Sequence, residues 1–161
     1  MALVFLVLLL GAGTLLSSTD ADEAYSKLPE TFKKGVDLAV QQVNSHANIK
    51  QPFNFFKSLD SSEGSFSVKF IYHNFYLKAT TCAKGTSNLN QCPFRNDRPL
   101  IDCTVCYKMY GQNIEVEPKP FVHCVHKPSI NLEVRTKRIN HCNHMIYLTG
   151  SPTIFAVKSP E

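Results

Sequence analysis

The clearest hydrophobic pattern in the chain lies in residues 29–48, where apolar side chains recur at intervals of three and four. Phe32, Val36 and Val43 fall on one side, while charged and amide side chains take the other. This period predicts an amphipathic helix. A proline at its start suits the first helical turn, and Gly35 inside the pattern indicates a close approach to a neighbouring element.

Residues 66–81 show a different pattern, rich in Phe, Tyr, Val and Ile with partial alternation, which predicts a long strand. Neither face of it is cleanly polar, so we expect a bulge near residues 73–74 that exchanges the two faces. The Phe-rich residues 53–56 predict a shorter strand before it. Between the two, the polar residues 60–64 indicate a turn.

A polar loop at 82–99 leads to two further predicted strands, at 100–110 and 120–127, which residues 111–120 connect. The following segment, 130–140, predicts a fourth strand or a looser connection. One N-terminal helix followed by a run of strands indicates an α+β fold, with the helix packed on an antiparallel sheet.

The two ends of the chain differ from this middle part. Residues 3–16 are almost wholly apolar, and small polar residues follow at once, a pattern typical of a cleaved secretory signal. We predict a signal peptide at 1–21 with cleavage near Ala21, and an uncleaved membrane anchor is the alternative. The remainder then divides into a domain at 22–146 and a flexible C-terminal tail at 147–161, which has no cysteine to hold it.

The charge balance is moderately basic, with 17 Lys and Arg against 13 Asp and Glu and a net charge of +4. This permits contact with anionic partners such as glycosaminoglycans. Arg135, Lys137 and Arg138 form a basic stripe in the predicted fourth strand, which is either a solvated strand face or a polyanion-binding site. We predict a secreted monomer that binds no nucleic acid and is not embedded in a membrane.

The chain contains six cysteines, which either bind a metal ion or form disulfides. Cys103 and Cys106 form a C-x-x-C, and the motifs HCVH at 123–126 and HCNH at 141–144 complete a set that resembles a zinc site. A secreted chain, however, meets an oxidising compartment, which removes the thiolates that zinc requires. We therefore predict three disulfides and no metal. Because the histidines have no recognisable catalytic partner, we also predict no cofactor and no enzyme activity.

Strand geometry predicts how these cysteines pair. In an antiparallel hairpin, opposed residues have a constant sum of positions, and a turn centred near residues 113–114 places Cys103 opposite Cys124. Cys106 lies an odd number of residues further along, so it faces the other side and needs another partner, for which Cys142 remains. The predicted pairs are Cys82–Cys92, which closes the polar loop, Cys103–Cys124 and Cys106–Cys142.

These features resemble the cystatin superfamily. The likeness is carried by the motif YLKATTC that ends at Cys82, by the spacing from Cys82 to Cys92, and by the pair Cys103 and Cys124. It implies a long helix lying across a curved antiparallel sheet. Inhibitory cystatins have a Q-x-V-x-G loop and a later Pro-Trp, whereas this chain has GSFSV at 64–68 and no tryptophan, which argues against inhibition of cysteine proteases.

Within this superfamily the chain is similar to the chemerin family of secreted chemoattractant and adipokine precursors. The additional pair Cys106 and Cys142, the helix KKGVDLAVQQV at 33–43 and the end YLTGSPTIFAVKSPE at 147–161 carry the resemblance. It implies that serine proteases trim the C-terminus. It further implies that the trimmed chain activates a chemokine-like G-protein-coupled receptor in inflammatory and metabolic signalling.

The same resemblance implies roles for individual residues of the tail. Trimming at Val157 or Lys158 would remove a pro-segment of about 158–161. The residues implied in receptor binding are Tyr147, Gly150, Phe155 and Ala156. A cathelicidin-like host-defence role is the alternative within the superfamily.

Overall fold

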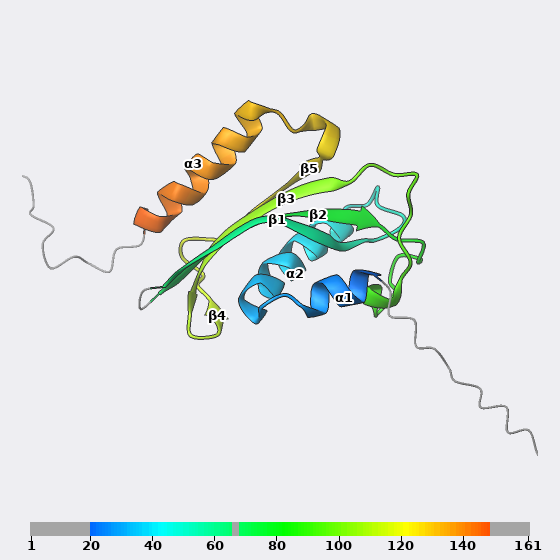
Figure 1. Ribbon diagram of the computed structural model, residues 1–161, viewed down its shortest axis with the longest axis horizontal. Coiled ribbons are helices and arrows are strands. Elements are labelled where there is room, and N and C mark those ends of the chain that lie inside the picture. Colours follow the sequence, from blue (N-terminus) through cyan, green and yellow to red (C-terminus); the bar gives the residue numbers. More distant parts are fainter. Residues whose placement is uncertain (1–19, 66–67, 149–161) are drawn as a thin grey trace, which may run out of the picture.

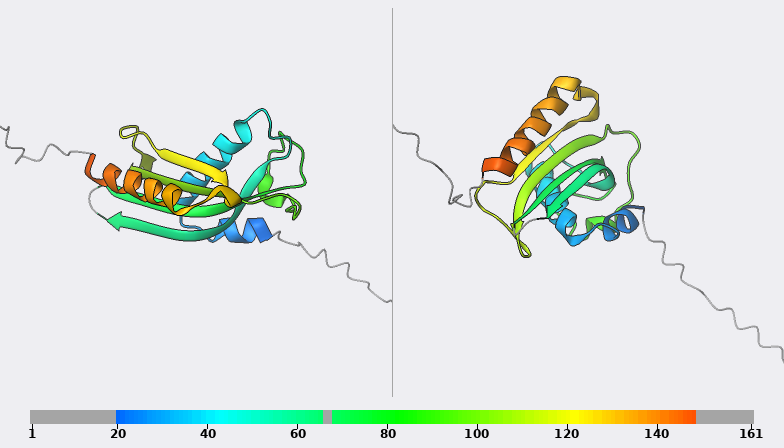
Figure 2. Two further views of the ribbon diagram at one scale, coloured as in Figure 1. Left: turned by 90° about the horizontal axis from the view of Figure 1, so that it is seen from above. Right: turned by 60° about the vertical axis from the view of Figure 1, so that its left-hand side comes forward.

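The computed structural model describes residues 20–65 and 68–148. In chain order its elements are α1 (Asp20–Ser26), α2 (Glu30–Ser45), β1 (Phe53–Ser65), β2 (Lys69–Ala79), η1 (Leu89–Gln91), β3 (Ile101–Tyr110), β4 (Asn113–Ile114), β5 (Phe121–His126), η2 (Lys127–Ser129) and α3 (Leu132–Leu148). The strands form one antiparallel sheet of order β1-β2-β3-β4, with β5 also paired to β3. Figures 1 and 2 show α1 and α2 against one face of the sheet and α3 along the other. The predicted α+β architecture is confirmed.

The helix predicted at 29–48 is confirmed as α2, which begins after Pro29 and ends at Ser45. Its buried side chains pack on the sheet, as the apolar spacing predicted. Gly35 marks the closest approach, since a Cβ placed there would lie 2.6 Å from Cε1 of Tyr107 in β3. The helix can therefore sit this close to the sheet only because the position lacks a side chain.

β1 is longer than its sequence pattern predicted. The turn expected at residues 60–64 is wrong, because the strand continues to Ser65. Its second half carries mostly polar, exposed side chains, since β1 is an edge strand whose backbone pairs with β2 on one side only. The bulge expected at residues 73–74 is also wrong. The register shifts instead in β1, at Phe56 and Leu59.

β3 is buried on both faces, although one of its faces carries the polar side chains of Asp102, Thr104 and Lys108. Cys103, Val105 and Tyr107 belong to the core beneath α2. Asp102 and Cys106 point to the opposite face, where they contact α3. One strand thus connects the main core with the second helical layer.

Three disulfides join the six cysteines in the same pairs as those predicted. Cys103 lies opposite Cys124 in the β3–β5 ladder, and their Cα atoms are 4.1 Å apart. Cys106, on the other face of β3, is bonded to Cys142 of α3 with a Cα–Cα distance of 5.8 Å. The third disulfide closes the loop that follows β2.

The segment at 130–140 was expected to be a strand or a looser connection, but from Leu132 onward it forms the first part of α3. Asn131 caps this helix, since its Oδ1 accepts a hydrogen bond of 2.9 Å from the backbone N–H of Val134. The buried positions follow helical spacing and are Arg138, Cys142 and Met145. The prediction was wrong because an arginine occupies a position where the helical pattern requires an apolar side chain.

α1 was not predicted from the sequence. It packs Ala24 and Tyr25 against the main core, and the Tyr25 hydroxyl donates a hydrogen bond of 2.7 Å to Asp37 of α2. The predicted cleavage near Ala21 falls in the first turn of α1. Residues 1–19 of the predicted signal peptide lie outside the described residues.

His73 is buried in the main core among aromatic rings. Its ring centroid lies 4.6–6.2 Å from those of Phe32, Phe55 and Phe75, and its Nε2 is 2.8 Å from the hydroxyl of Ser58. Burial lowers the pKa of His73 from 6.5 to about 4. The imidazole is therefore neutral in the folded protein at neutral pH.

This burial makes folding sensitive to acid. Between pH 6.5 and about 4 the unfolded chain binds a proton at His73 and the folded chain does not, so stability falls as the pH falls through this window. We expect the wild type to lose about 3 kcal/mol more than a His73→Phe variant between pH 7 and pH 4. Urea unfolding at both pH values measures the difference. The same substitution at the exposed His46 is the control, and an equal loss in the wild type and His73→Phe would contradict the expectation.

Candidate functional site

α3 is attached to the outer face of the sheet by a disulfide and a small apolar cluster. The bond between Cys106 and Cys142 connects β3 with the middle of the helix. Met145, one turn further on, is buried beside this bond. The side chains packed around these residues are Phe70, Tyr72 and Phe121. This cluster is separate from the core beneath α2, so the helix forms a second layer of its own.

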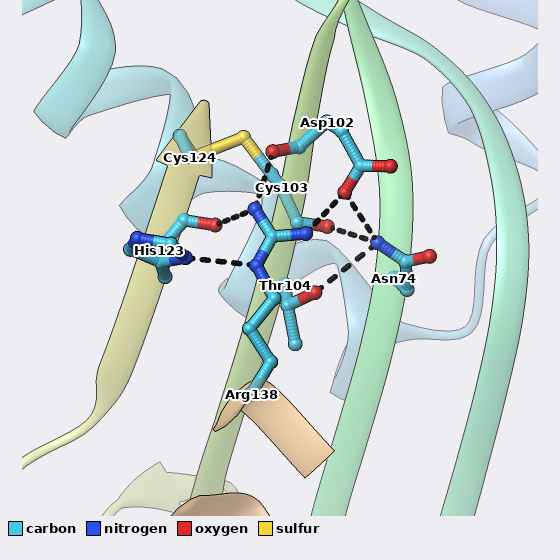
Figure 3. The surroundings of a disulfide bond; sticks show 7 residues. All are labelled: Asn74, Asp102, Cys103, Thr104, His123, Cys124 and Arg138. Carbon is cyan, nitrogen blue, oxygen red and sulfur yellow. Dashed lines mark hydrogen bonds and ion pairs between the residues drawn. A yellow bond between two sulfur atoms is a disulfide. The ribbon is translucent and has the colours of Figure 1, made fainter. Parts of the chain in front are cut away.

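A buried ion pair fixes the first half of α3 on the sheet (Figure 3). Arg138 and Asp102 are only 4% and 2% exposed, and Nη1 of the guanidinium donates to the carboxylate. Nη2 donates to the backbone carbonyls of Asp102 and His123 at 2.9 and 3.0 Å. Asn74 in β2 donates to the same carboxylate at 2.9 Å. The arginine thus binds β3 and β5 at once, beside the Cys103–Cys124 disulfide.

His123 completes this polar cluster as a neutral acceptor. Nε of Arg138 donates to Nδ1 of His123 at 2.8 Å. Burial, and next the neighbouring guanidinium, lower the pKa of His123, while Asp102 acts in the opposite direction. A protonated Nδ1 could not accept this bond, so the arrangement requires the uncharged ring.

Sequence reasoning missed the partners of Arg138, although one signal was present. Asp102 is an acidic residue inside a predicted strand, and such a residue is buried only when it is paired. The pattern does not say which cation pairs with it. The partner lies 36 positions away on an element that was predicted to be a strand.

The basic stripe predicted from Arg135, Lys137 and Arg138 is not formed. Arg138 is directed into the sheet, and Lys137 is exposed and paired with Glu133 at 2.6 Å. Arg135 lies beside a hollow between α3 and the strands. Arg138 lines the same hollow three positions further on, but its guanidinium is bound to Asp102, and Lys137 is turned about 100° away from it around the helix. The prediction of Arg138 as part of a polyanion site is wrong.

The last turn of α3 is held by the sheet but exposes its aromatic side chain. Nζ of Lys108 in β3 donates a hydrogen bond of 3.1 Å to the carbonyl of Ile146. Burial lowers the pKa of this ammonium group. Tyr147, the next residue, is 83% exposed. The helix end therefore has a fixed place while Tyr147, which was predicted to bind a receptor, faces solvent.

A hollow of about 400 Å³ lies beside this helix end, between α3 and the β1–β2 hairpin. Its apolar wall includes Phe70, Tyr72 and Ile146, and its acidic wall includes Asp60 and Glu63. The pKa of Glu63 is lowered, mainly by the hydrogen bond from Lys69. The surface next to the helix end thus combines apolar area with carboxylates.

The other predicted receptor-binding residues, Gly150, Phe155 and Ala156, lie outside the described residues, as do the predicted cleavage positions Val157 and Lys158. The GSFSV segment falls at the β1–β2 hairpin, of which residues 66–67 are not described. Between residues 20 and 148, apart from that gap, no helix is long and apolar enough to cross a membrane.

The zinc-like motifs are divided between separate elements. His123 and His126 lie on β5, whereas His141 and His144 lie on α3, and His141 stacks on Phe121 with ring centroids 4.1 Å apart. The six cysteine sulfur atoms form three disulfide bonds, so none of them can act as a thiolate ligand. In the part of the chain that the structure describes, no three His, Cys, Asp or Glu residues are placed to hold a metal ion.

Three comparisons relate the chain to known proteins. Models of protein families give no match, and neither do curated protein sequences. Among solved structures, the fold is similar to the crystal structure of dimeric human cystatin F, with a TM-score of 0.44 and 18% sequence identity. That match covers 58% of this chain and 79% of the cystatin F chain.

Proposed function

We propose that this chain is the secreted precursor of a chemerin-type receptor ligand, which becomes active when its C-terminus is trimmed. The observation that carries the proposal is the end of α3. The sheet binds α3 at three places, namely Arg138, Cys142 and the carbonyl of Ile146. Tyr147, the next residue, is exposed. A body of this kind presents its C-terminal residues from a fixed point. Three disulfides are typical of a protein that works outside the cell.

The activating step follows from the chemistry of the last residues. Cleavage after Val157 or Lys158 leaves a new carboxyl end close behind Phe155 and removes the terminal Glu161. Aromatic side chains such as Phe155 and Tyr147 supply most of the binding energy when they enter a receptor pocket. A longer end would add bulk and charge behind these anchors. The precursor is therefore expected to bind weakly until a serine protease shortens it.

A truncation series tests this proposal. Chains ending at Val157, Lys158 and Glu161 are applied to cells that bear a chemokine-like G-protein-coupled receptor, and calcium release and migration are measured. We expect the two shorter chains to act at concentrations at least about tenfold below that of the full chain, a difference of about 1.4 kcal/mol in binding. Equal silence from all three chains would contradict the ligand function.

Point variants of the trimmed chain separate the anchor from its neighbours. Phe155→Ala is expected to abolish the response, because it removes an aromatic anchor, whereas Ile154→Ala is the matched control and should lose much less. A cystatin-type inhibitor is the rival, since Gly64 and Ser65, the first residues of GSFSV, form the end of β1. Nanomolar inhibition of papain by the full chain, together with an unchanged response of Phe155→Ala, would favour that rival.

A further inference from the structure

A group of lysines and aromatic rings lies on the face of the sheet that carries α3. Lys78 Nζ lies 4.6 Å from the ring centroid of Phe56 and 5.7 Å from that of Phe94. Two other lysine ammonium groups lie 5.2–5.9 Å from the rings of Phe56 and Tyr76. We call this group the lysine–aromatic platform, and its members are Phe56, Lys57, Tyr76, Lys78, Phe94 and Lys127.

The β-bulge in β1 creates this platform. Phe55 is buried in the core, and the register shift beside it leaves Phe56 as the extra residue, so Lys57 pairs with Tyr76 of β2. Opposed residues of a ladder share a face, so Lys57 and Tyr76 point to the same side. Lys78 stands two positions after Tyr76 and therefore joins them on this side. The bulge thus places a ring and a cation from consecutive positions next to each other.

The remaining members are held by rigid connections. Phe94 lies two positions after the loop that the Cys82–Cys92 disulfide closes. Its segment is bound to the end of β2 by a bridge from Phe94 to Thr80 and by a hydrogen bond of 2.8 Å from the N–H of Arg95 to the carbonyl of Ala79. The backbone N–H of Lys127 donates a bond of 2.8 Å to Leu100 just before β3. Cation–π contacts restrict the lysine side chains further. The platform is therefore pre-organised.

Its positive charge is not neutralised from within the protein. Among the residues that the structure describes, none of Lys57, Lys78 and Lys127 takes part in an ion pair, and Lys78 donates only to the neutral amide of Asn96 at 2.7 Å. The neighbouring carboxylates are occupied elsewhere: Asp97 is paired with Arg95, and Asp102 with Arg138. Three lysine charges thus remain available for an anionic ligand.

We propose that the lysine–aromatic platform binds a sulfated polysaccharide. Sulfates would pair with the ammonium groups, while the apolar faces of sugar rings would lie against the partly exposed rings of Phe56 and Phe94. Phe56 and Phe94 are half-buried and Tyr76 is buried, so no ring protrudes far enough to insert into a lipid layer. An extended acidic peptide would pair with the free edge of β1, whereas the platform side chains lie on the face of the sheet. This inference is independent of the proposed receptor function and goes beyond it.

Charge-matched variants of the full-length chain provide the test. The platform variant carries Lys57→Gln, Lys78→Gln and Lys127→Gln, and the control carries Lys34→Gln, Lys50→Gln and Lys119→Gln, so both lose the same charge. Binding to immobilised heparin is measured at about 0.15 M salt. We expect the platform variant to bind at least about tenfold more weakly than the wild type, and the control to stay within about twofold. Desulfated heparin should not bind.

The outcomes are distinct. Equal weakening in both variants would show that net charge alone is responsible, and an unchanged platform variant would show that the ligand binds elsewhere; either result overturns the proposal. Stronger binding to phosphatidylserine vesicles than to heparin would also overturn it, in favour of a membrane surface. Circular dichroism verifies that each variant is folded. Platform substitutions in the chain trimmed at Val157 should leave its receptor response unchanged, so this test and that of the ligand function can fail separately.

Discussion

Replacing Arg138 with alanine is expected to lower the free energy of unfolding by about 3–5 kcal/mol. The substitution removes the guanidinium that donates to Asp102 and His123 and leaves the carboxylate of Asp102 buried without its cation. A charge that has lost its buried partner cannot recover its hydration, so the loss exceeds the net value of the pair. Urea unfolding at pH 7 measures the change.

Two further variants isolate the cause. Lys137→Ala removes an exposed pair from the same helix and should change stability by no more than about 0.5 kcal/mol. The double variant Asp102→Leu and Arg138→Met should recover most of the loss, since neither charge remains buried. If Arg138→Ala cost no more than Lys137→Ala, the ion pair would not be what holds the first half of α3.

Replacing Cys106 and Cys142 together with serine is expected to destabilise the protein by about 2–5 kcal/mol and to loosen α3 selectively. The bond spans 36 positions and is the covalent link between the helix and the sheet. Hydrogen exchange measured by mass spectrometry should show faster exchange in α3. The core beneath α2 should stay protected, because Cys103–Cys124 remains intact.

The loop disulfide supplies the matched control. Cys82 and Cys92 are separated by only 10 positions, so their replacement should cost less and should leave the exchange of α3 unchanged. Unaltered exchange of α3 after loss of Cys106–Cys142 would contradict the view that this bond anchors the helix.

The parts of the fold that follow a regular period were predictable. α2 shows a continuous apolar stripe, and the β3–β5 hairpin obeys a simple register that places Cys103 opposite Cys124. The odd spacing from Cys103 to Cys106 then decides that the second bond lies on the other face. In these cases the local pattern and the tertiary contacts point to the same structure.

α3 and the second half of β1 were not predictable in the same way. The buried side of α3 contains Arg138, whose partners belong to distant strands, so its apolar pattern is interrupted. β1 is polar beyond Leu59 because an edge strand needs no apolar residues to form its ladder, which makes the sequence look like a turn. Both errors arise where backbone pairing or a buried charge outweighs the hydrophobic period.

The candidate site was predictable only in part. Tyr147 lies exposed at the end of α3, where the resemblance to the chemerin family implied a receptor contact. The contact from Lys108 to Ile146 that holds this end could not be foreseen, because it depends on a lysine at a buried strand position. The lysine–aromatic platform depends on a β-bulge at Phe56, which no pattern in the sequence predicted.

The form of the protein that is active in nature can be determined directly. Protein secreted by cells that express the full chain is separated into its mass forms. The termini and disulfides of each form are mapped by mass spectrometry, and each form is applied to cells that bear a chemokine-like receptor. We expect the active form to end at Val157 or Lys158 with three intact disulfides, and the form ending at Glu161 to be silent. A form ending at Glu161 that is as active as the shorter forms, or an active form with free thiols, would contradict activation by trimming of a disulfide-stabilised precursor.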